Sequence, residues 1–136
     1  MTGTDWPEPG VVDLWWLNPS LLSRAAWSKL RSSLSTDEQS RAEASPALTD
    51  ELVAGRGLLR LSLSSYLRVP PAALRFDECP TGKPRLAGPA AEKLSFNLSH
   101  TQGLVVCGVA RSELGVDLAY VQRPAPLDVA RHYFSQ

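Results

Sequence analysis

Residues 50–67 read DELVAGRGLLRLSLSSYL and carry the clearest helical pattern in the chain. Four large apolar or aromatic side chains in this stretch are spaced by seven, four and three positions, which places them on one face of a helix. They are Leu52, Leu59, Leu63 and Tyr66. A pair of prolines at positions 70 and 71 stops the helix, because proline cannot continue it. The segment therefore predicts a long helix that contributes one face to the core.

Toward the N-terminus, the pattern predicts one strand and two further helices. Residues 11–17 are rich in Val, Leu and Trp and are followed by an Asn-Pro pair, as expected for a short strand. A helix is expected over residues 20–30. The Ser-Thr pair at positions 35 and 36, followed by two acidic residues, is a capping signal for another helix, which Pro46 interrupts.

After the long helix, the pattern changes to short strands separated by Gly and Pro. Strands are expected at residues 74–79, 94–99, 104–110 and 114–121, with a Gly/Pro-rich loop at 80–89 and the start of a helix at 127–134. Helices followed by an antiparallel meander are typical of the α+β class. We therefore predict an α+β fold in which helices pack on a small antiparallel sheet.

Composition and charge narrow the class of function. The 136 residues, 43% of them apolar, can fill one modest core. Lys plus Arg and Asp plus Glu number 14 each, so the chain has no bulk field to attract nucleic acid or an anionic membrane, and we expect neither as a partner. The apolar runs are too short and too interrupted by charge to cross a bilayer. Cys79 and Cys107 have no metal-like spacing and no secretory leader precedes them, which predicts a cytoplasmic location.

Arg56 interrupts the apolar pattern of the long helix. It lies four positions after Leu52 and three before Leu59, where an unpaired guanidinium would be costly. Two interpretations remain open at this point. Arg56 forms a salt bridge with a carboxylate of the core, or it reaches the phosphate of a ligand.

Asp117 is a charged residue within the expected strand at 114–121, much as Arg56 is a charged residue within the apolar face of the long helix. The two-residue alternation of a strand places it on a face flanked by the small residues Gly115 and Ala119. Space around a strand carboxylate suits a metal or a ligand, because a packed core would fill it with bulk. The alternative is a solvent-facing strand residue.

Several polar groups follow one another at short intervals in the last third of the chain. Lys83 offers an amine, Ser99 a hydroxyl, His100 an imidazole and Asp117 a carboxylate able to hold a magnesium ion. Together they predict a site for a phosphate-rich ligand, such as a nucleotide or a coenzyme. Zinc and hydrolase chemistry are not expected, since the two histidines lack nearby cysteine or acidic partners and no Gly-x-Ser-x-Gly motif occurs.

Three short runs occur in a fixed order along the chain. They are Gly-Lys-Pro at 82–84, Phe-Asn-Leu-Ser-His at 96–100 and Gly-Val-Asp-Leu at 115–118. With matching flanks along nearly the whole chain, they closely resemble the Sfp-type 4′-phosphopantetheinyl transferases. The resemblance implies one pseudo-symmetric half of that family's fold. It also implies transfer of the 4′-phosphopantetheine arm of coenzyme A to a serine of an acyl, peptidyl or aryl carrier protein.

The same resemblance implies roles for individual residues. Asp117 would be the catalytic acid that holds Mg2+. Lys83, Ser99 and His100 would contact the adenosine and phosphate portions of coenzyme A, and Arg56 would bind a phosphate. The partners implied are coenzyme A and a carrier protein.

The chain also departs from the family's pattern. Ala119 stands where many members carry a second acid, and Gln136 ends the chain where the family continues into a second half. We therefore expect an N-terminal subdomain at 1–122 and the start of a second subdomain at 123–136. Activity would then require the missing half, and the surface left open would favour self-association. The alternative is a non-catalytic remnant that binds coenzyme A or a carrier protein.

Three tryptophans lie in the N-terminal part of the chain. Trp15 and Trp16 are neighbours in the expected strand and point to opposite faces, and Trp27 falls in the first expected helix. We expect all three to belong mainly to the core, and the alternative is a surface that would meet the missing half.

Overall fold

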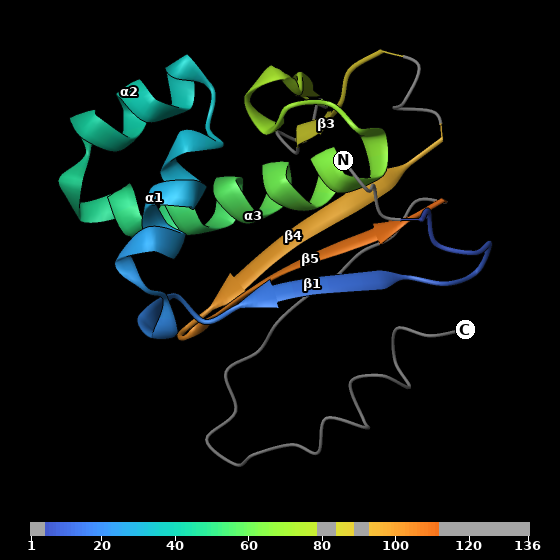
Figure 1. Cartoon of the computed structure of the whole chain (residues 1–136), viewed down its shortest axis with the longest axis horizontal. Helices are drawn as coiled ribbons and strands as arrows, with labels where there is room; N and C mark the ends of the chain where they lie inside the picture. The colour runs from blue at the N-terminus through green and yellow to red at the C-terminus, as the bar shows by residue number, and fades with distance from the viewer. Residues whose placement is uncertain (1–4, 79–83, 89–92, 112–136) are drawn as a thin grey trace.

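A three-stranded antiparallel sheet forms one layer of the protein (Figure 1). The computed structural model describes residues 5–78, 84–88 and 93–111. The strands are β1 (Asp13–Leu17), β4 (Ser95–Thr101) and β5 (Leu104–Ala110), in the order β1-β5-β4. The strands predicted at 11–17, 94–99 and 104–110 and the α+β class are confirmed.

The sheet is not the simple meander that the sequence predicted. β4 and β5 form a hairpin whose turn includes Gly103 with a φ of +80°, a conformation that favours glycine. β1, from the start of the chain, pairs with the free edge of β5, with Trp15 opposite Cys107. This pairing covers an edge of β5 that the hairpin alone would leave open.

A second, two-stranded sheet joins the strand predicted at 74–79, which is confirmed, to a segment that the sequence assigned to a loop. β2 (Phe76–Glu78) pairs antiparallel with β3 (Pro84–Leu86), and the loop assignment is wrong for β3. Leu86 is buried in the core, and the ring of Phe76 packs edge-on against Phe96 of β4 with centroids 5.7 Å apart. The Gly and Pro residues of this segment indicated a loop. A proline is nevertheless tolerated at the first position of a short strand, which is where Pro84 lies in β3.

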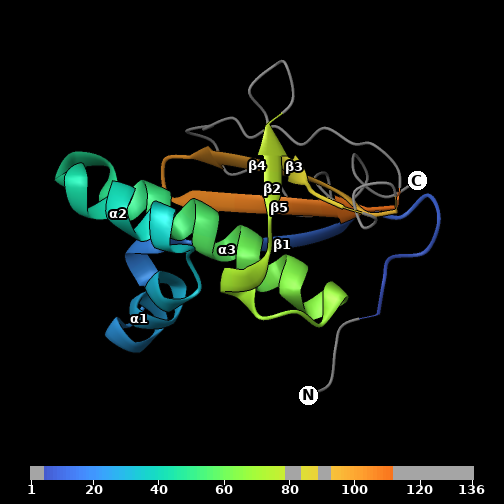
Figure 2. The same cartoon turned by 90° about the horizontal axis from the view of Figure 1, so that it is seen from above.

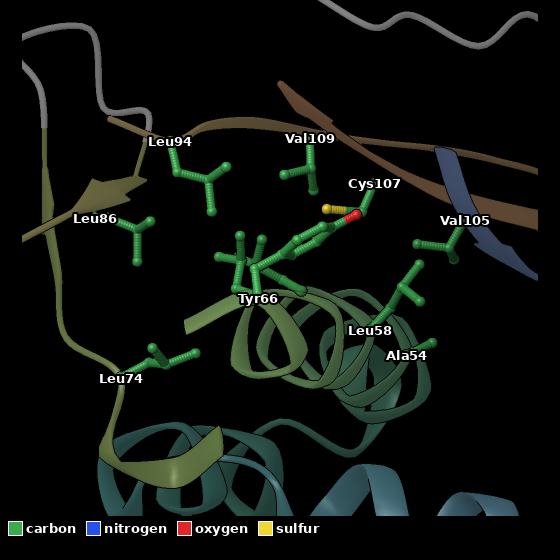
Figure 3. Close-up of a cluster of buried hydrophobic side chains, with 11 residues drawn as sticks. Ala54, Leu58, Tyr66, Leu74, Leu86, Leu94, Val105, Cys107 and Val109 are labelled. Atoms are coloured by element: carbon green, nitrogen blue, oxygen red, sulfur yellow. The ribbon is translucent and has the colours of Figure 1, made fainter. Parts of the chain in front are cut away.

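The long helix α3 (Thr49–Leu67) packs against the sheet with one side and against α1 (Arg24–Ser32) and α2 (Thr36–Ala44) with another (Figure 2). On the sheet side, Leu58 and Tyr66 of α3 meet Cys107 and Val109 of β5 in the larger core cluster (Figure 3). Leu59 and Leu63 are fully buried in the same cluster. These contacts fix the position of α3 on the sheet.

A smaller core cluster lies between α3 and the two N-terminal helices. It joins Leu30, Leu34 and Ala42 to Val53 of α3, and Leu52 packs against it. Leu52 shares the helix face of Leu59, Leu63 and Tyr66, as the spacing predicted, but its side chain packs against this smaller cluster, whereas the other three belong to the larger one. α3 buries side chains on two sides, so a single apolar stripe does not describe it.

Serine caps define the two N-terminal helices. The Ser23 hydroxyl accepts a hydrogen bond from the Ala26 amide and begins α1, so the start expected at Ser20 is wrong. The preceding residues form the separate 3-10 helix η1 (Pro19–Leu21). The predicted second cap is confirmed, because Ser35 and Glu38 form a reciprocal capping box at the start of α2. Prolines begin two further 3-10 helices, η2 (Pro46–Leu48) and η3 (Pro71–Ala73).

The tryptophans occupy different environments. Trp15 donates a hydrogen bond to the Tyr66 hydroxyl, which in turn donates to Asp13, and burial raises the pKa of Tyr66 above its usual range. Trp27 packs against both core clusters. Trp16 lies on the opposite face of β1 and is 66% exposed, so its assignment to the core is wrong.

Some predictions fall outside the described residues. They concern the strand at 114–121, the helix at 127–134 and the subdomain at 123–136. In the described part of the chain, the helices are too short or too polar to cross a bilayer.

The thiol of Cys107 gives a direct test of the larger core cluster. Cys107 is fully buried, and this burial raises the pKa of its thiol to about 11, partly offset by a hydrogen bond from Ser62. At pH 8 the thiol is protonated in the fold, so we expect a Cys79→Ser variant to react with a disulfide reagent at least about a hundredfold more slowly when native than when unfolded in urea. Absorbance of the released thiolate measures both rates. Equal rates would contradict the burial of Cys107.

Candidate anion-binding site

Two of the predicted site residues, Arg56 and His100, line the same hollow on the protein. Arg56 lies on α3 and His100 lies near the end of β4, so the packing of α3 on the sheet brings them together. The hollow has a volume of about 560 Å3. Its other lining residues are Arg41, Ser45, Glu51, Leu52, Gly55 and Leu98.

Of the three other predicted site residues, only Ser99 lies in the part of the chain that the structure describes. Ser99 is half-buried, and strand alternation directs it to the face of the sheet opposite His100. Lys83 and Asp117 lie outside the described residues.

The position of Arg56 agrees with both interpretations that the sequence left open, a salt bridge to a carboxylate and contact with the phosphate of a ligand. Its Nε lies 3.8 Å from Oε2 of Glu38, and its side chain is 27% exposed and faces the hollow. Glu38 thus partly neutralises Arg56 without enclosing it. A guanidinium that is held at one nitrogen and open at the others can still bind an anion.

Arg60 is the buried arginine of α3, and it was not among the site residues predicted from the sequence. Its side chain is 5% exposed, and its Nε donates to Oε1 of Glu38 over 2.5 Å. Its NH1 donates to the carbonyls of Pro71 and Leu74, each at 2.9 Å. The one signal in the sequence was its position four residues after Arg56, on the same side of the helix.

Glu38 is the carboxylate that connects the two arginines. Oε1 accepts hydrogen bonds from Arg60 and from the Ser35 amide, and Oε2 faces Arg56. Because Glu38 belongs to the first turn of α2, it holds this helix against the middle of α3. Its capping motif was visible in the sequence, and its ion pairs were not.

Glu51 and His100 form a second polar contact at the hollow, which is an ion pair only when His100 is protonated. Oε1 of Glu51 contacts Nε2 of His100, and both side chains are about half exposed. Both residues also line a neighbouring hollow of about 500 Å3, with Asp50, Thr101 and Gln102 among its walls. Neither Glu51 nor Arg41 was predicted as a site residue, since only the packing of α2, α3 and β4 places them beside Arg56.

The hollow has the composition of an anion site with an apolar wall. Arg41 and Arg56 carry positive charge, His100 adds a charge when it is protonated, and Leu52 and Leu98 supply apolar surface. Within residues 5–78, 84–88 and 93–111, no group of three His, Cys, Asp or Glu side chains is placed to hold a metal ion.

The sequence model of a protein family described as 4′-phosphopantetheinyl transferase, N-terminal, matches residues 18–113. The chain belongs to this family. The matched region includes Arg56, Lys83, Ser99 and His100 and ends before Asp117. The predicted resemblance to phosphopantetheinyl transferases is confirmed, and the Sfp type within them stays a prediction.

Individual relatives agree with this assignment to the 4′-phosphopantetheinyl transferase family. The chain is 40% identical over 110 residues to 4′-phosphopantetheinyl transferase HetI of Nostoc sp., covering 77% of this chain and 46% of that protein. It is 30% identical over 135 residues to a phosphopantetheinyl transferase of Thraustochytrium sp., covering 93% and 46%. It is 31% identical over 81 residues to a 4′-phosphopantetheinyl transferase of Bacillus subtilis, covering 60% and 35%. The chain spans about half or less of the length of these relatives.

Proposed function

We propose that the hollow lined by Arg41, Arg56 and His100 binds phosphate groups of coenzyme A. The observation that supports this proposal is the convergence of these three side chains from α2, α3 and β4 in one hollow. Coenzyme A carries several phosphate groups next to an adenosine, which matches a basic site with an apolar wall. The known relatives bear the name of a transferase of the phosphopantetheine group, which is a part of coenzyme A.

In this proposal, each described residue has a distinct task. Arg56 donates its free guanidinium N–H groups to a phosphate while Glu38 limits the directions it can take. His100 donates a second, charge-assisted hydrogen bond when protonated. Leu52 and Leu98 contact the less polar part of the ligand.

The reaction that we propose is transfer of the 4′-phosphopantetheine arm of coenzyme A to a carrier-protein serine. The serine hydroxyl gives its proton to a base, the serine oxygen forms a bond to the β-phosphorus, the bond from that phosphorus to the bridging oxygen breaks, and adenosine 3′,5′-bisphosphate leaves with that oxygen. We assign Lys83 and Ser99 to coenzyme A binding and Asp117 to Mg2+, in an N-terminal subdomain that ends near residue 122. Bound Mg2+ would neutralise negative charge on the phosphates.

Titration of this chain with adenosine 3′,5′-bisphosphate tests the site. We expect Arg56→Ala and His100→Ala each to raise the Kd by roughly tenfold to a hundredfold, because each removes a charge-assisted hydrogen bond. Arg24→Ala removes an exposed arginine at the start of α1 and is the matched control, with a change of less than about twofold. Isothermal titration calorimetry gives all four Kd values.

Two results would contradict the proposed function. One is the absence of binding by the unaltered, folded chain. The other is an equal loss of affinity in all three variants, which would mean that the ligand responds only to overall charge.

A further inference from the structure

Glu51 places a carboxylate against His100 at the edge of the anion-binding hollow. Its Oε1 contacts Nε2 of His100, and the two side chains are 51% and 58% exposed. Glu51 lies in the first turn of α3 and His100 near the end of β4, so the contact exists only because α3 packs on the sheet. The Nε2 atom that contacts Glu51 is the one that a phosphate would need as a donor.

The charges around this contact oppose one another. Arg41, Arg56 and His100 attract an anion, whereas Glu51 carries the one carboxylate among the described residues that line this hollow. A phosphate that approaches His100 therefore meets a like charge at short range. Because the side chains of Glu51 and His100 are both about half exposed, water and salt screen this repulsion, and its effect on affinity is moderate.

We propose that Glu51 determines the affinity of this site by occupying the position on His100 that a ligand phosphate must take. This inference rests on the proposed coenzyme A site. Binding then requires the Glu51 carboxylate to turn away from His100 before Nε2 can donate to the phosphate. Glu51 therefore lowers the affinity of the site most for ligands with the highest negative charge. It lowers the affinity least for uncharged ligands.

The position of the pair between two hollows supports this role. Glu51 and His100 line the hollow that contains Arg56, and they also line the neighbouring hollow with Asp50 and Gln102. Because Glu51 is about half exposed, its side chain has room to move without disturbing the core. Its movement away from Nε2 frees His100 at the hollow of Arg56.

The test is calorimetric titration of the Glu51→Gln chain with adenosine 3′,5′-bisphosphate and with adenosine. Glutamine keeps the shape of the side chain and removes its charge. We expect the Kd for the bisphosphate to fall by roughly fivefold to thirtyfold relative to the unaltered chain, and the Kd for adenosine to change by less than about twofold.

Asp50→Asn is the matched control, because Asp50 is the neighbouring acid in the same first turn of α3 and does not line the hollow of Arg56. We expect it to change the Kd for the bisphosphate by less than about twofold. The effect of Glu51→Gln should also shrink in a His100→Asn background, since the competition for Nε2 is then absent.

The outcomes separate this inference from the proposed function. If the unaltered chain binds the bisphosphate and Glu51→Gln binds it equally or more weakly, the role of Glu51 is overturned and the site stands. If Asp50→Asn tightens binding as much as Glu51→Gln, overall charge explains the result and the role of Glu51 is again overturned. If no folded variant binds the bisphosphate, both the site and the role of Glu51 are overturned.

Discussion

Glu38→Ala is expected to lower the free energy of unfolding by about 3–5 kcal/mol, because it removes one partner from a buried ion pair. The side chain of Arg60 is 5% exposed and its Nε bonds to Glu38 over 2.5 Å. Without this carboxylate, Arg60 keeps only the carbonyls of Pro71 and Leu74, which do not neutralise its charge. The Ser35 amide at the start of α2 also loses its acceptor.

Urea unfolding of two further variants shows whether the ion pair is the cause. Glu43→Ala changes an exposed glutamate of the same helix and should cost less than about 0.5 kcal/mol. A Glu38→Ala, Arg60→Met double variant removes both charges and should recover part of the loss. A loss below about 1 kcal/mol in Glu38→Ala would contradict the importance of this pair.

Gly57→Val is expected to cost about 3 kcal/mol, because α1 crosses α3 at this glycine. A Cβ at position 57 would lie 2.7 Å from Cδ2, 2.9 Å from Cβ and 3.2 Å from Cα of Leu30. Leu30 is 4% exposed and belongs to the smaller core cluster, so it has little room to retreat. The two helices must therefore separate.

Gly55→Val is the matched control for this effect. A Cβ at position 55 meets only Cδ2 of Leu98, at an ordinary 3.5 Å, and faces the anion-binding hollow. Glycine and valine differ little in helix propensity, so the difference between the two variants reports the steric effect. We expect Gly55→Val to change the stability by less than about 1 kcal/mol in the same urea titration. Equal costs at the two positions would contradict the close approach of α1 and α3.

The local elements were largely predictable because their signals lie within a few residues of one another. The Ser35 capping box, the helix that ends at Leu67 and the strands around Trp15 and Cys107 all follow from periodicity, caps and breakers. β3 was missed because a three-residue strand beginning with proline has too little alternation to register. The resemblance carried by three short motifs also predicted the family correctly.

The candidate site was only partly predictable. Arg56 and His100 were named from the sequence, and the structure places both at one hollow. Arg41 and Glu51 were not predicted as site residues, because each is an ordinary exposed charge until α2, α3 and β4 are packed together. No local pattern distinguishes such a residue from its solvated neighbours.

The sequence by itself determined which segments become helices and strands, where most of them end and which family the chain belongs to. The tertiary structure decided that β1 joins β5, that Glu38 binds Arg60 across 22 positions of the chain, and that Glu51 reaches His100. The physical reason is the range of the forces involved. Backbone geometry and caps act within one or two helical turns, whereas ion pairs and strand pairing between distant segments depend on how the core packs as a whole.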